Sequence, residues 1–404
     1  MRTFFLPALL LTASFNVFAH SIPSEIGQPQ LDVSLAVTAR TDGAVASDEY
    51  WRIPGVMMGG HAWPAQRGIS MDELSLSLGY RIDENFFAVL KAAQHSGHDD
   101  GPSIEHAWVG YVCCDSVGPL VIEAGRMSAA FTPSVSEHSS ARIFSDATLP
   151  ADAFLGRHFH DNGFRLWRHN PHGISFGVEL WQGEAFPASA DDSGGAADLF
   201  ASLNHQSGRL TLQTGVWTLF ARATERPDHR YSDGHTHGGI GAVPPPDVRF
   251  TGDSVLGGIH ALIGWQVRSD MRAALRMEWM QVEADGVIED ITRRAAIDSV
   301  YSGIIVQPEI TVARHSFALR AEQLVLDNHV TGAAALPLSE DANLINDHNP
   351  WRLGLGWRWQ WRDALALRAD LTRDATLGSA ENRAAIGLVW HQSLTRQGAH
   401  QHSP

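Results

Sequence analysis

The feature that most constrains the fold of this chain is an alternation of apolar and polar residues, which is clearest over residues 349–374. There, tryptophan, leucine and alanine occupy most of the alternate positions, while arginine, glycine and glutamine lie between them. Because successive side chains of a β-strand point to opposite faces, this pattern predicts strands whose two faces meet different surroundings. Similar segments recur about sixteen times over residues 31–394, and no helical periodicity of comparable length competes with them.

The connections between these predicted strands alternate strictly between short and long. The long ones are rich in Gly, Pro, Asp and His, and they cover residues 41–71, 95–103, 128–160, 183–195, 223–250, 283–297, 327–349 and 373–381. Outer-membrane barrels have this layout, with short periplasmic turns and long extracellular loops. The sequence therefore predicts an all-β fold, a transmembrane antiparallel β-barrel of about sixteen strands.

The N-terminus has the pattern of a secretory signal peptide, in which Arg2 precedes an apolar stretch that ends near Ala19. We expect residues 1–19 to be this signal, residues 20–30 a periplasmic segment, residues 31–394 the barrel, and residues 395–404 a histidine-containing tail. An exported barrel is expected in the outer membrane of a Gram-negative bacterium, with membrane lipid and the barrel-assembly machinery as partners. The formal net charge of −15 argues against a nucleic-acid partner.

The two faces of the predicted wall differ in charge. Backbone groups in lipid must be paired within the protein, so the sheet must close, and one face then meets lipid while the other meets the lumen. Trp351, Leu353 and Leu355 would face lipid, whereas an arginine facing lipid near the midplane costs about 2–4 kcal/mol. The charged positions predicted to line a pore are Arg165, Glu179, Arg272, Arg276, Glu278, Arg320, Glu322, Arg352, Arg358, Arg368 and Asp370.

About sixteen strands leave an aqueous channel in a barrel, whereas eight leave only a packed interior. The segment 128–160 is our candidate for a loop that folds inward and narrows this channel. The alternative explanation for the inward charges is a salt-bridged polar filling that conducts nothing.

Two stretches resemble a known family. Residues 121–154, "VIEAGRMSAAFTPSVSEHSSARIFSDATLPADAF", and residues 160–186, "HDNGFRLWRHNPHGISFGVELWQGEAF", are similar to the constriction-loop region and the following hairpin of the phosphate-selective porin O and P family. The resemblance implies a sixteen-stranded porin for small solutes, normally a homotrimer. Phosphate-selective members use lysine-rich loops, whereas Lys91 is the single lysine of this chain, so phosphate selectivity is not expected.

Histidine is unusually frequent, with 21 residues, and more than half of them lie in the predicted outer loops. Imidazole and carboxylate groups are suitable ligands for zinc, copper or nickel. The candidate metal ligands are His95, His98, Asp99, His158, His160, His229, Asp233, His235 and His237. None of these clusters has the fixed spacing of a structural zinc site, so we expect no required cofactor and only weakly bound zinc. The alternative is that these histidines are soluble loop residues that bind no metal.

Together these features predict a porin for the passive diffusion of small solutes or ions, with divalent metal such as zinc, or its chelates, as one candidate. The alternatives are a non-conducting structural barrel or adhesin, and a metal-binding surface barrel. The sequence has no Gly-x-Ser-x-Gly, no His-Glu-x-x-His and no paired carboxylates in a recognisable setting. The chain is therefore not expected to be an enzyme.

Overall fold

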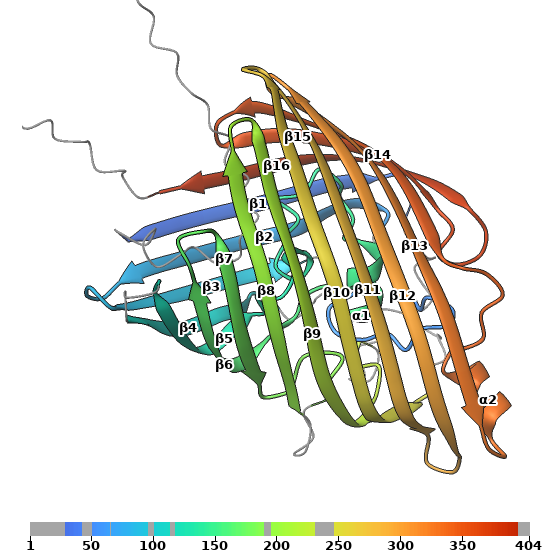
Figure 1. The fold of residues 1–404 in the computed structure, drawn as a ribbon. Coiled ribbons are helices and arrows are strands. Elements are labelled where there is room, and N and C mark those ends of the chain that lie inside the picture. Colours follow the sequence, from blue (N-terminus) through green and yellow to red (C-terminus); the bar gives the residue numbers. More distant parts are fainter. Residues whose placement is uncertain are drawn as a thin grey trace, which may run out of the picture.

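The computed structural model describes residues 29–42, 51–64, 66–95, 101–113, 118–189, 195–230 and 246–394. These residues form a closed barrel of sixteen antiparallel strands, in which each strand pairs with its sequence neighbours and β1 closes on β16 (Figure 1). The strands are β1 (Gln30–Arg40), β2 (Gly68–Arg81), β3 (Phe86–His95), β4 (Ser103–Cys113), β5 (Leu120–Ser128), β6 (His160–His169), β7 (Ile174–Trp181), β8 (Gly195–Ser207), β9 (Leu210–Arg226), β10 (Arg249–Arg268), β11 (Met271–Glu289), β12 (Arg294–Val312), β13 (His315–Thr331), β14 (Trp351–Arg362), β15 (Leu365–Asp374) and β16 (Glu381–Ser393). The predicted fold class is confirmed.

The barrel also confirms that the connections at one end are short. Turns such as Gly208 with Arg209, between β8 and β9, lie at the same end as Gln30 and Ser393, the outer ends of β1 and β16. The predicted signal peptide, most of the segment 20–30 and the tail 395–404 lie outside the described residues.

One predicted long connection is wrong. We expected a loop over residues 283–297, but β11 continues to Glu289 and β12 begins at Arg294, so only residues 290–293 join them. The carboxylate of Asp290 accepts hydrogen bonds from the backbone N–H groups of Thr292 at 2.8 Å and Arg293 at 2.7 Å, which closes a tight turn. The acidic residues before this turn suggested a loop because they face water on a strand that extends past the membrane.

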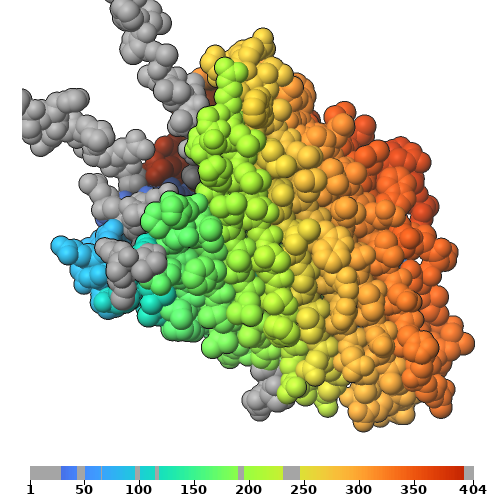
Figure 2. Space-filling model, in the orientation of Figure 1, coloured from blue at the N-terminus to red at the C-terminus, as the bar shows by residue number. Residues whose placement is uncertain are grey.

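The extent of the lipid-facing band can be measured along β10. Its outward positions are apolar or glycine from Val255 to Trp265. The outward residue just before this stretch, Asp253, forms an exposed ion pair with Arg222 at 2.9 Å, which marks the end of the band. Ten residue steps at about 3.3 Å make about 33 Å of strand. A tilt of about 40° reduces this to about 25 Å, the height of the apolar band of outer-membrane barrels. Figure 2 shows this face as a continuous wall, and β9 to β13 run beyond the shorter strands in Figure 1.

The hairpin of β14 and β15 has the predicted lipid face. Leu353, Leu355 and Leu371 are about half exposed on the outside of the barrel. The Trp357 and Trp359 rings stack with a centroid separation of 6.5 Å, near the turn end of β14. Tryptophans at a strand end are typical of the aromatic girdle at the headgroup boundary.

The core of the molecule lies inside the barrel. Two helical segments occur outside the strands, α1 (Leu149–Phe154) and α2 (Ala335–Asp341), and α1 lies within the barrel in Figure 1. None of the helices in the described ranges is long and apolar enough to cross a membrane. Trp51, Ile53 and Phe131 belong to a buried apolar cluster with inward side chains of the wall, among them Trp181, Trp217, Leu256, Met280 and Leu324. The inner face of β7 to β13 therefore carries apolar side chains between its charged ones, which the alternation pattern did not predict.

The lipid-facing assignment makes a test possible with two isoleucines. Ile259 is 53% exposed at the middle of the outward band of β10, whereas Ile291 is 99% exposed in the turn between β11 and β12. We expect Ile259→Arg to lower the free energy of unfolding by about 2–4 kcal/mol in lipid vesicles. Ile291→Arg should leave it nearly unchanged, because that side chain already meets water. Urea titration of the refolded variants measures both, and equal effects would contradict the assignment.

Candidate functional site: a charged cavity beside an inward loop

Residues 129–159, between β5 and β6, fold into the barrel as predicted for the segment 128–160. We call them the inward loop. Its neck is closed by a backbone hydrogen bond from the Ala129 N–H to the Phe159 carbonyl at 3.0 Å. Between these ends the chain forms a 3₁₀ turn at Pro133–Val135 and the helix α1, and most of its side chains are buried.

Carboxylates of the wall accept hydrogen bonds from the inward loop. Glu179 on β7 accepts the Ala130 N–H at 2.9 Å. Glu322 on β13 accepts the Leu149 N–H at 2.9 Å. The Asp370 carboxylate of β15 accepts the Ser145 N–H. The Glu278 carboxylate of β11 accepts the hydroxyl groups of Thr132 and Ser134. Loop N–H and hydroxyl groups that would otherwise be buried without partners are thus satisfied by the wall.

Arginines of the wall donate to carbonyls of the same loop. Arg368, which is fully buried, donates to the Ser139 carbonyl at 2.6 Å. Arg358 donates to the carbonyls of Ser140 at 3.0 Å and Arg142 at 3.1 Å. Charge-assisted bonds of this kind are stronger than neutral ones. The inner wall therefore binds the loop backbone at both its N–H groups and its carbonyl oxygens.

All eleven residues that the sequence placed in a pore lie on the inner face of the barrel. Ten of them bond directly to residues of the predicted loop 128–160. Of these residues, Arg352 alone also borders a cavity that lies beside the inward loop. They point inward, and their chief contacts are with the loop; their role in a pore stays a prediction.

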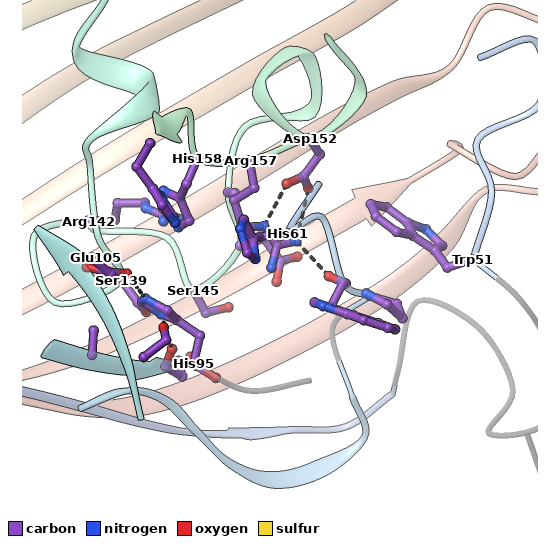
Figure 3. A pocket seen from close by; sticks show the side chains of 18 of the residues that line it. Trp51, His61, His95, Glu105, Ser139, Arg142, Ser145, Asp152, Arg157 and His158 are labelled. Carbon is purple, nitrogen blue, oxygen red and sulfur yellow. Dashed lines mark hydrogen bonds and ion pairs between the residues drawn. The ribbon is translucent and has the colours of Figure 1, made fainter. Parts of the chain in front are cut away.

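A cavity of about 210 Å³ lies between the inward loop, the segment 51–64 and the wall formed by β1 to β6, β14 and β16. Figure 3 shows Trp51, His61, Arg157 and Asp152 on one side of it, and His95, Glu105 and Ser139 on another. The segment 51–64 was not predicted to fold inward. Its apolar residues lie in a stretch rich in glycine and proline, which indicated only an outer loop.

The charges that border the cavity are largely paired. Arg157 contacts Asp152 at 2.7 Å, and Arg383 contacts Asp146 at 2.9 Å. Arg40 contacts Asp72 at 2.9 Å. The cavity wall thus has six arginines, but neighbouring carboxylates neutralise much of their charge.

Burial and neighbouring charges set the ionisation of the loop. Burial on its own would raise the pKa of Asp146, but Arg383 and Arg40 lower this pKa below its usual range, so the carboxylate is charged. Burial lowers the pKa of Arg142 to about 10, which keeps its guanidinium charged at neutral pH. Burial and the nearby Lys91 lower the pKa of His138 to about 4, so its imidazole is neutral.

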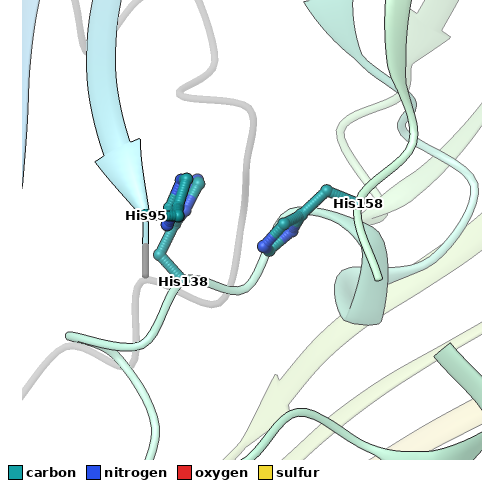
Figure 4. Close-up of side chains that lie close together, drawn as sticks. All are labelled: His95, His138 and His158. Atoms are coloured by element: carbon teal, nitrogen blue, oxygen red, sulfur yellow. The ribbon is translucent and has the colours of Figure 1, made fainter. Parts of the chain in front are cut away.

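Three histidines meet at one edge of the cavity. His95 ends β3, while His138 and His158 belong to the inward loop, and one ring nitrogen of each lies within 4.8 Å of those of the other two (Figure 4). The sequence placed His95 and His158 in separate candidate clusters, and it missed His138. The only signal for His138 was its position in a loop already expected to fold inward.

The remaining metal candidates do not join this group. His160 stacks on His61 with a centroid separation of 4.9 Å, and His229 is exposed. His98, Asp99, Asp233, His235 and His237 lie outside the described residues, so the structure places none of them.

The hold of the wall on the inward loop can be tested on β15. Arg368→Met removes a fully buried guanidinium that bonds Ser139, Thr38 and Asp72, so we expect the free energy of unfolding to fall by roughly 3–5 kcal/mol. Trypsin should then cleave the loop faster at Arg142. The control is Arg373→Met, the same change on the exposed face of the same strand, which should alter neither measurement. Equal protease resistance in both variants would contradict the anchoring role.

No protein-family model matches the chain, and no curated protein sequence matches it. Solved structures do share its fold. The outer membrane channel DcaP of Acinetobacter baumannii superposes with a TM-score of 0.53 at 10% identity, covering 90% of this chain and 96% of that one. OmpT of Vibrio cholerae gives 0.52 at 11% identity, with coverage of 90% and 97%. OprB of Pseudomonas putida gives 0.51 at 12% identity, with coverage of 91% and 94%.

These similarities confirm the outer-membrane barrel fold that the resemblance to porins implied. Membership of the phosphate-selective porin O and P family stays a prediction, because no family model matches. The chain has the sixteen-stranded architecture of outer-membrane β-barrel proteins, among them a channel.

Proposed function

We propose that the chain is an outer-membrane channel for the passive diffusion of small hydrophilic solutes or ions. The observation that carries this proposal is the cavity of about 210 Å³, lined by charged side chains inside a closed wall. A sixteen-stranded barrel is wide enough to hold water. The inward loop packs its apolar side chains against β7 to β13, and the cavity beside β1 to β6 is the path that we propose. The fold shared with the DcaP channel is consistent with this function.

The chemistry of the cavity favours some solutes over others. Its arginines are largely neutralised by Asp72, Asp146 and Asp152, so the wall lacks the unpaired positive charge that would favour phosphate. The imidazoles of His95 and His158 and the carboxylate of Glu105 also border it. We infer that divalent metal ions such as zinc, or their small chelates, are among its solutes, since these groups suit such ions.

We also propose that the channel is a homotrimer in the outer membrane of a Gram-negative bacterium and carries out no catalysis. One solved form of OmpT of Vibrio cholerae, with a TM-score of 0.51 and 12% identity, is described as a trimer. The apolar outer band of the barrel, such as Leu353 and Leu355 on β14, suits lipid or a second subunit.

A non-conducting structural barrel is the second candidate. The observation that favours it is the apolar packing of the segment 51–64 and the inward loop against the wall, which fills much of the lumen. Conductance separates the two functions.

Thiol labelling in a planar bilayer tests the path. In a background with Cys113→Ser and Cys114→Ser, we expect stepwise conductance, and Ser103→Cys should place a thiol at the cavity edge. A positively charged methanethiosulfonate should then lower the single-channel conductance, because it adds bulk and charge to the path. Ser302→Cys, on the outer face of β12, is the control and should not respond. If no steps appear in the background protein, the channel function is excluded and the structural barrel is favoured.

A further inference from the structure

The three histidines at the cavity edge form a compact triangle inside the barrel. Their ring centroids are 5.6 Å apart for His95 and His138, 5.2 Å for His138 and His158, and 5.5 Å for His95 and His158. They come from the end of β3 and from two distant positions of the inward loop, so only the folded barrel brings them together. Figure 4 shows His158 turned toward the other two rings.

Hydrogen bonds determine which nitrogen of each ring can bind a metal. Nδ1 of His158 lies 3.2 Å from the Val135 carbonyl, and Nδ1 of His95 lies 3.3 Å from the Asp72 carbonyl. A carbonyl can only accept, so Nδ1 carries a proton in both rings, and Nε2 is the nitrogen that a metal would bind. Histidine ligands of metals commonly donate their other nitrogen to a backbone carbonyl in this way.

His138 offers a third lone pair. Its Nε2 is within hydrogen-bonding distance of the ammonium group of Lys91, which can donate to it. Its Nδ1 is buried and makes no hydrogen bond with any residue in the described part of the chain. With Lys91 donating to Nε2, Nδ1 carries the ring proton, so a metal would bind Nε2 in place of the Lys91 ammonium group.

The surrounding charge favours a cation. The Glu105 carboxylate oxygen lies 2.6 Å from Nε2 of His95, so either an N–H of the ring or a bound cation must lie between these two atoms. Lys91, the single lysine of the chain, lies 2.9 Å from the other Glu105 oxygen, and Nε2 of His138 lies 3.8 Å from that oxygen. A second carboxylate, that of Glu73, accepts the Ser140 N–H next to His138 at 2.7 Å.

We propose that His95, His138 and His158 bind a divalent transition-metal ion such as Zn²⁺ inside the barrel, with Glu105 as the fourth ligand. Three histidines and one oxygen ligand form a common tetrahedral zinc site. Bonds of about 2.0–2.1 Å place ligand atoms about 3.3 Å apart in a tetrahedron. The nitrogens lie within 4.8 Å of one another, so rotations of about 1 Å at the side-chain ends are enough to close the site.

The folded barrel supports the ligands of this site. His95 lies on a barrel strand, and the loop that carries His138 is held next to it by the Arg368 bonds to Ser139. Ligands on rigid elements keep the geometry that a metal needs.

A bound ion would also narrow the path, because His95 and His158 border the cavity. This second part rests on the proposed channel function, whereas the binding itself does not.

Binding is measured on the full, untagged chain refolded in detergent, because an affinity tag of histidines would bind metal itself. We expect one Zn²⁺ per chain by isothermal titration calorimetry, and the visible absorption of tetrahedral Co²⁺ when Co²⁺ replaces it. His138→Gln and His158→Gln should each weaken binding at least about 100-fold, since loss of even an outer-shell partner weakens metal sites by about 10–100-fold. His205→Gln, at an exposed position of β8, is the matched control and should bind as the parent does.

Several outcomes would overturn the site. Binding that is unchanged in folded His138→Gln and His158→Gln, or that disappears in the combined His229→Gln, His235→Gln and His237→Gln variant, would place the metal in an outer loop instead. Circular dichroism and the shift in gel mobility on heating show whether each variant is folded. If His138→Gln does not fold, His158→Gln alone decides, because its ring is at the loop end.

Conductance separates this inference from the channel proposal. Zn²⁺ should reduce the single-channel current of the parent but not that of His138→Gln. A protein that binds one Zn²⁺ and conducts nothing would keep the site and exclude the channel. A protein that conducts and binds no Zn²⁺ would exclude the site and keep the channel.

Discussion

The structure depends on hydrogen bonds between charged side chains of the inner wall and the backbone of one loop. A charge that faces inward must find a partner or water, since an isolated buried charge is strongly unfavourable. Arg358 and Arg368 solve this by donating to loop carbonyls, and Glu179 and Glu322 by accepting loop N–H groups. The same bonds satisfy a long segment of irregular backbone that could not otherwise be buried. The wall and the loop therefore require each other.

This mutual dependence divides the lumen into two halves. Over β7 to β13 the inner wall contributes apolar side chains that pack against Trp51, Phe131 and Phe154 as a protein core does, between charged residues such as Glu278. On the opposite side, ion pairs such as Arg40 with Asp72 leave a polar space beside the loop. The cavity and the three histidines lie on this second side.

The sequence predicted the wall well because the period of two is set by backbone geometry and each strand carries the pattern independently. It predicted less about what each inward residue touches. Nothing local indicates that Arg358 meets Ser140, since 218 positions separate them. The same reason explains why His138 was missed, because its partners come from β3 and from the far end of the loop. The loop predicted at residues 283–297 was wrong for another reason. Asp285 is a residue type common in loops, but here it pairs with Asp298 in the part of the sheet that extends beyond the lipid.

That extension has a consequence for how the molecule is stabilised. Beyond the apolar band, Phe250, Ile288 and Ile297 form a small separate cluster with Leu338 and Leu344, at the water-side ends of β10 to β12. Here water, not lipid, is the solvent, so burial of these side chains is driven as in soluble proteins and weakened by urea in the same way. One continuous sheet thus joins a portion that lies in lipid to a portion that is stabilised as a small soluble domain is. A change of solvent conditions such as added urea therefore affects the two portions differently.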